Sequence, residues 1–264
     1  MVDWSGHIVP IVVTVAIWFA ATGLIALSVS DDERGGAARA KLRSVAIGGV
    51  LGVGGLGAIL VSASMVSVGG VYLAFVGALL TWAWHEIAFL TGAVAGPRRT
   101  PCPPGLTGFA RFTRASGTVM HHEIALALTA LMLISLSWNA ANQIGATVFA
   151  LLFALRLSSK INLFVGVPNS TTEMLPSHLS YLRSYFGRNR LTVLLGVSIL
   201  CIFAGAAWFA SFAMAAAPGS AQMVGASLLA ALAALGALEH IFLALPFRDG
   251  MLWGWAFRRQ RTAP

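Results

Sequence analysis

Long apolar stretches alternate with short polar segments along the whole chain. Seven of these stretches are close to the roughly 20 residues that an α-helix needs to cross the hydrocarbon core of a bilayer. They cover Gly6–Val29, Val45–Ser67, Val71–Ala95, Thr118–Trp138, Ala140–Ser158, Leu191–Ala217 and Ala221–Leu245. The pattern predicts an all-α fold, a polytopic bundle of seven transmembrane helices, with residues 1–264 forming a single integral membrane domain.

Basic residues alternate too. All 17 Lys and Arg residues lie in every second gap between the apolar stretches, or at the helix end beside such a gap. The gaps at 68–70, 139 and 218–220 and the start before Gly6 carry none. Basic loops are retained in the cytoplasm during insertion. We therefore expect the N-terminus outside and the C-terminus in the cytoplasm.

Composition agrees with a membrane protein and excludes a soluble one. The chain is 58% hydrophobic and 10% charged, with a mean hydropathy of +0.82, whereas soluble domains are about 25% charged. The net charge of +8 lies in segments beside the membrane, so it favours the lipid bilayer as a partner and argues against nucleic acid. Met1–Ser5 has no basic residue, so we expect no cleavable signal peptide.

The predicted cytoplasmic loops hold most of the elaborate sequence. Gly96–Gly105 is rich in Pro and Gly and is not expected to be helical. After Pro176, apolar residues fall at helical spacing and predict a short amphipathic helix between spans five and six. These loops suggest a partner-binding surface formed by Arg98, Arg99, Tyr181, Arg183 and Tyr185.

Span two carries a GxxxG step at Gly48 and Gly52. Small residues allow helix backbones to approach closely in lipid. The step favours a contact between helices of the same chain over a homodimer interface.

Three spans carry a carboxylate beside a histidine, at His85-Glu86, at His122-Glu123 (preceded by His121) and at Glu239-His240. At 1.5 Å per residue, the three carboxylates lie about 9–14 Å inside the cytoplasmic boundary, in one polar layer. Span five approaches this layer with the i, i+4 pair Arg156 and Lys160, followed by Asn162. Ionisable residues at such depth face the bundle interior and are candidates for function.

The residues alone leave several interpretations of this layer open. Its members could satisfy one another, with Glu paired to Arg or Lys and His paired to Glu. Arg156 and Lys160 could instead extend to the cytoplasmic surface. A proton relay in a transporter is a further possibility, although no discontinuous helix or inverted repeat supports it.

Two ligand-binding interpretations also stay open. Zinc or a di-iron pair could be held by His and Glu, although adjacent His and Glu lie about 100° apart on a helix and cannot easily chelate one ion. The ligands would come from His85, Glu86, His122, Glu123, Glu239 and His240. Alternatively, one histidine could ligate a tetrapyrrole packed by Trp82, Trp84 and Phe89.

No Gly-x-Ser-x-Gly, Gly-x-x-x-x-Gly-Lys or His-Glu-x-x-His pattern is present, so the sequence assigns no catalytic residue. This favours a role other than catalysis. A membrane-embedded His/Glu metalloenzyme acting on a tetrapyrrole or lipid precursor is the alternative.

Several segments between residues 84 and 245 resemble the PuhE family, photosynthetic complex assembly protein 2, of anoxygenic phototrophic bacteria. The Arg-Leu-x-x-Lys-x-Asn-Leu-Phe run at 156–164, leading into Gly166-Val167-Pro168-Asn169, is the most specific. The others are Trp84-His85-Glu86, Phe89–Gly92, Gly96–Arg99, Cys102-Pro103, His122-Glu123, Leu175-Pro176, His178-Leu179, Tyr181-Leu182 and Leu238-Glu239-His240.

The resemblance implies a part in assembling the reaction centre and light-harvesting core, or in bacteriochlorophyll supply. Reaction-centre or light-harvesting subunits would be the partners, and bacteriochlorophyll or a His/Glu-bound metal the candidate cofactor. The location would be the bacterial inner membrane, cytoplasmic or intracytoplasmic. The family contributes no catalytic residue.

Overall fold

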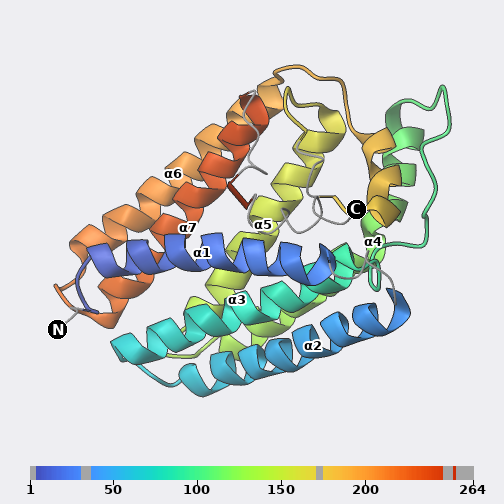
Figure 1. Cartoon of the computed structure of the whole chain (residues 1–264). Coiled ribbons are helices and arrows are strands. Elements are labelled where there is room, and N and C mark those ends of the chain that lie inside the picture. The colour runs from blue at the N-terminus through green and yellow to red at the C-terminus, as the bar shows by residue number, and fades with distance from the viewer. Residues whose placement is uncertain (1–3, 31–36, 171–174, 246–251, 254–264) are drawn as a thin grey trace.

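The protein is described by a computed structural model that covers residues 4–30, 37–170, 175–245 and 252–253. Seven long helices are apolar enough to cross a membrane, and no strand occurs in these ranges. They are α1 (Ile8–Ser30), α2 (Ala37–Ser62), α3 (Val68–Leu90), α4 (Gly108–Ser137), α5 (Ile144–Val165), α6 (Val193–Ala215) and α7 (Ala221–Ala244). The chain is thus an all-α, multi-pass membrane protein, as predicted (Figure 1).

Three helices extend beyond the predicted apolar stretches by about two turns or more. α2 begins at Ala37 and α4 at Gly108, so both start with turns that carry basic residues, and α5 continues to Val165. Hydropathy locates the membrane-embedded part of a helix, whereas the helix itself continues until its backbone is interrupted. α5 ends at Val165, before Gly166, whose φ is 132° and where a Cβ would lie 2.4 Å from the carbonyl oxygen of Arg188. Only glycine fits this position.

α3 is the central helix, since it packs along α2 and also contacts α1, α4, α5 and α7. α6 packs along α7 at the edge of the bundle, as Figure 1 shows. The main core lies between α3, α4, α5 and α7, around Phe75, Leu126, Phe149 and Leu228. This arrangement brings the membrane-embedded faces of five helices, α1, α3, α4, α5 and α7, around one space.

Four glycines of α2 face α3: Gly48, Gly49, Gly52 and Gly55. A Cβ on Gly52 would lie 2.6 Å from the Trp84 side chain, and one on Gly55 would lie 2.5 Å from the carbonyl oxygen of Gly77. Gly48 faces Ile87 and Trp84. The predicted contact within the chain is therefore confirmed.

The predicted short helix between spans five and six is present as a 3₁₀ helix, η2 (Ser177–Tyr185). Its buried residues include Leu179, Leu182 and Tyr185, which follow one another at the i, i+3 spacing that lines up along a 3₁₀ helix. Leu179 and Leu182 pack against Phe89 and Ala95. The apolar face of η2 is therefore covered by the protein itself.

η2 and the Pro-rich loop between α3 and α4 form one ordered structure at the end of the bundle that carries the basic loops, here called the basic end. The Tyr185 hydroxyl donates to the Thr100 carbonyl (3.1 Å), and the Cys102 N–H donates to Ser184 Oγ (2.8 Å). Arg111 Nη2 donates to the carbonyls of Tyr185 (2.6 Å) and Phe164 (3.2 Å). These bonds connect both loops to α4 and α5.

Candidate functional site

A partly open cavity of about 1150 Å³ lies among α1, α3, α4, α5 and α7. η2 contributes to its lining beside the basic end, and Trp253 contributes beside α1. The Trp253 indole N–H donates to the Phe19 carbonyl (2.9 Å), and its ring packs edge-on against Trp18. Most of the lining is aliphatic or aromatic, so the charged residues within it stand out.

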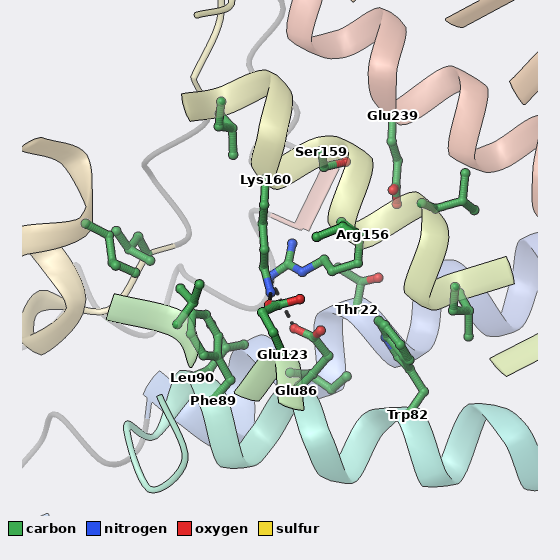
Figure 2. A pocket seen from close by; sticks show the side chains of 18 of the residues that line it. Thr22, Trp82, Glu86, Phe89, Leu90, Glu123, Arg156, Ser159, Lys160 and Glu239 are labelled. Atoms are coloured by element: carbon green, nitrogen blue, oxygen red, sulfur yellow. Dashed lines mark hydrogen bonds and ion pairs between the residues drawn. The ribbon is translucent and has the colours of Figure 1, made fainter. Parts of the chain in front are cut away.

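Four charged side chains form one wall of the cavity, and we call this set the charged wall: Glu86, Glu123, Arg156 and Lys160. Glu86 projects from α3, Glu123 from α4 and both cations from α5, and Figure 2 shows them converging. Arg156 Nη2 lies 3.3 Å from Glu86 Oε2. Lys160 Nζ donates to Glu123 Oε1. The cations therefore pair with carboxylates of neighbouring helices and do not extend to the surface.

His122 closes the charged wall behind Glu86. It is completely buried, its Nε2 lies 3.8 Å from Glu86 Oε1, and its ring centroid lies 4.6 Å from that of Phe89. That separation from Glu86 is too long for a hydrogen bond. Lys160 Nζ lies 5.1 Å from the Phe89 ring centroid, within cation–π range.

Glu239 enters the same cavity from α7 and, in the view of Figure 2, lies apart from the Lys160–Glu123 pair. Its Oε1 accepts a hydrogen bond of 2.7 Å from the Trp18 indole N–H. The cavity therefore contains all three carboxylates of the predicted polar layer. Two of them belong to the charged wall, and the third connects α7 to α1.

The remaining polar-layer residues lie outside the cavity lining. His85 Nε2 lies 3.1 Å from Thr129 Oγ1 between α3 and α4, and His121 is exposed on α4. His240 Nε2 lies 3.0 Å from Ser158 Oγ, and Asn162 Nδ2 donates to Ser198 Oγ (3.0 Å). Through these serine hydroxyl groups, His240 links α7 to α5, and Asn162 links α5 to α6.

The geometry does not favour either ligand-binding interpretation of the histidines. In the described part of the chain, no three His, Cys, Asp or Glu side chains are close enough to hold a metal ion. None of the described histidines lines the cavity. His122 is enclosed by Glu86 and Phe89, which leaves no room for a tetrapyrrole on its ring.

The five predicted partner-binding residues divide into two groups. Tyr181 and Tyr185 are buried, and burial raises the pKa of each phenol; both stay neutral and support the fold of the loops. Arg99 and Arg183 are exposed, and Arg98 is half-buried. Arg99 Nη2 also donates to the Gly92 carbonyl (3.0 Å). A partner contact stays a prediction for the three arginines.

Sequence reasoning missed Trp18, Thr129, Ser158 and Ser198, the uncharged partners of the polar layer. Hydroxyl and indole groups are common in transmembrane helices and interrupt no hydropathy pattern. Ser158 could nevertheless have been predicted as a partner of the polar layer, because it precedes Asn162 by one helical turn and lies on the same helix face.

A relative supports the placement of the chain in a family. The chain is 41% identical, over 243 residues, to the “uncharacterized 30.4 kDa protein in puhA 5'region” of Rhodobacter capsulatus. The match covers 92% of this chain and 88% of that protein. No solved structure matches the chain significantly. The model of one family, described as “Protein of unknown function (DUF3623)”, matches residues 5–264, and the chain belongs to that family.

Proposed function

We propose that this protein is a membrane assembly factor for the photosynthetic reaction centre and light-harvesting core complex. It would lie in the inner membrane of a phototrophic bacterium, cytoplasmic or intracytoplasmic, with its C-terminus in the cytoplasm. A role in bacteriochlorophyll supply is compatible with the same place in assembly.

The observation that carries this proposal is the match to the Rhodobacter capsulatus protein, which is named for its position in the puhA 5' region. The match extends over almost the whole of both chains, so a shared role is a reasonable inference. The resemblance to the PuhE family implies the same gene neighbourhood, that of the reaction centre.

The basic end offers a surface for partner subunits. Tyr185, Ser184 and Arg111 hold η2 and the Pro-rich loop in one ordered structure. Arg99 and Arg183 are exposed on this structure. A preformed basic surface suits an acidic cytoplasmic segment of a membrane partner, because steering and register both depend on complementary charge.

Gene replacement in Rhodobacter capsulatus tests the proposal. Deletion of the puhA-region relative is expected to lower the yield of assembled reaction-centre core complex per cell, measured by sucrose-gradient fractionation and near-infrared absorption. Expression of the present chain in the deletion strain is expected to restore it. Unchanged complex yield in the deletion strain would overturn the assembly role.

Affinity purification tests the surface. Tagged protein, solubilised in mild detergent during active assembly, is expected to retain reaction-centre or light-harvesting subunits identified by mass spectrometry. Arg99→Glu/Arg183→Glu is expected to release them, whereas Asn139→Glu, an exposed change between α4 and α5, is the matched control. Equal retention by both variants would exclude these arginines as partner contacts.

A further inference from the structure

We propose that the cavity binds one uncharged amphipathic membrane lipid. Its polar group, a hydroxyl or carbonyl, would lie against the charged wall, and its hydrocarbon chain would follow the apolar faces of α1, α3 and α7. This inference rests on the cavity alone and does not depend on the assembly role.

Size and lining indicate the class of ligand. The cavity, at about 1150 Å³, exceeds the roughly 300–1,000 Å³ that holds drug-sized molecules. Its apolar lining includes Ile17, Phe75, Leu79 and Leu232. A long hydrocarbon chain suits these surfaces. Because lipid tails provide an equally apolar environment, the chain contributes little selectivity, and the polar group must provide it.

The charged wall favours a polar group without net charge. Its two carboxylates and two cations form two ion pairs, so the wall is neutral as a set. The other charged side chains that line the cavity are one carboxylate, Glu239, and one cation, Arg183, so the whole charged lining is also balanced. An ionised ligand placed here would bring a charge without a counter-charge into a medium of low dielectric, which is costly.

Hydrogen-bonding capacity is still present in this neutral wall. The side chain of Arg156 is 36% exposed, and Nη2 is the atom that contacts Glu86; a guanidinium has five N–H donors in all. Within the described chain, Glu86 Oε1 and Glu123 Oε2 accept no hydrogen bond. A carbonyl can accept from Arg156, and a hydroxyl can accept from Arg156 and donate to a carboxylate after a small side-chain movement.

Three probes with the same chain test the charge preference: oleyl alcohol, oleate and oleylamine, each titrated into the full-length protein in detergent and counted by native mass spectrometry. Oleyl alcohol is expected to bind at one copy per chain, at least about tenfold more tightly than either charged probe. Equal binding of oleate or oleylamine, or no saturation at one copy, would overturn the proposal.

Two variants change the charge of the wall. Glu86→Gln leaves Arg156 positive, since a guanidinium does not lose its proton in proteins, and is expected to shift the preference to oleate by about tenfold. Glu86→Gln/Arg156→Gln is neutral again and is expected to restore the preference for the alcohol. An unchanged preference in Glu86→Gln would contradict the charge argument. If Glu86→Gln does not fold, the double variant still tests the charge argument. A preference of Glu86→Gln/Arg156→Gln for a charged probe would contradict it.

A second pair of variants tests the location. Ala83 lines the cavity, whereas Val76, on the same helix, is exposed and does not line it. Ala83→Phe is expected to abolish binding at one copy per chain, and Val76→Phe to leave it unchanged. Binding that survives Ala83→Phe would place the lipid outside the cavity.

Discussion

At the scale of single residues, the ion pair between Lys160 and Glu123 is stable only when both charged side chains are present. The two side chains are 17% and 20% exposed and bond across α5 and α4. Removing one member of a buried ion pair costs about 3–5 kcal/mol, because the remaining charge has no partner, while replacing both is often tolerated.

Glu123→Gln is therefore expected to lower the free energy of unfolding by about 3–5 kcal/mol. Glu123→Gln/Lys160→Gln is expected to recover most of this loss. Unfolding of the purified protein in mixed micelles of increasing SDS content measures both. A double variant no more stable than Glu123→Gln would mean that the cation is not stabilised by the carboxylate.

The composition of the polar layer was predictable from the sequence, but its pairing was not. Depth along each helix can be counted from the apolar boundary, so Glu86, Glu123 and Glu239 were placed at one level, and all three line the cavity. Which carboxylate meets Arg156 depends on the rotation of each helix about its axis, which hydropathy does not determine. Adjacent residues point about 100° apart, so His240 meets Ser158 of α5 while Glu239 meets Trp18 of α1, and His85 meets Thr129 while Glu86 meets Arg156.

At the scale of elements, the close approach of α2 to α3 depends on Gly55. A Cβ here would lie 2.5 Å from the Gly77 carbonyl oxygen, a backbone atom that cannot rotate away. A Cβ on Gly57, half a helical turn further on, would meet no atom within 4 Å, and this glycine lies on the exposed side. Gly55 and Gly57 therefore lie on the same helix, but only Gly55 packs against a neighbouring helix.

Gly55→Ala is expected to destabilise the protein by about 1–3 kcal/mol through overpacking. Gly57→Ala is expected to be neutral or to stabilise by up to about 1 kcal/mol, since alanine is the better helix former. SDS unfolding compares the two variants with the parent protein. Equal effects of both substitutions would show that α2 and α3 do not pack as closely as described.

η2 shows why the local conformation of a short element is hard to predict. Leu175, Leu179, Leu182 and Phe186 indicated α-helical spacing, but three of the four residues buried in η2, Leu179, Leu182 and Tyr185, follow the i, i+3 spacing of a 3₁₀ helix instead. The same burial explains why Tyr181 and Tyr185, predicted as partner contacts, became internal supports. Amphipathic spacing identifies a covered face but does not indicate whether lipid, a partner or the chain itself covers it.

At the scale of the whole molecule, the remaining question is which face of the membrane the basic end occupies. If each of the seven helices crosses the membrane once, the link between α3 and α4 and the link between α5 and α6 lie on one side, and the link at 138–143 lies on the other. Arg98, Arg99, Arg111 and Arg114 follow the end of α3. Because such basic segments are retained in the cytoplasm, we expect the basic end to face the cytoplasm.

Cysteine labelling checks this orientation with residues that the chain already provides. In Cys201→Ser, the partly exposed Cys102 at the basic end remains. A membrane-impermeant maleimide is expected to label it only after the inner membrane is permeabilised. In Cys102→Ser/Cys201→Ser/Asn139→Cys, the new thiol lies at the opposite end and is expected to react in cells whose inner membrane is intact. Labelling of Cys102 in such cells would reverse the topology and move the exposed arginines to the face opposite the cytoplasm, where the proposed contact with cytoplasmic partner segments could not form.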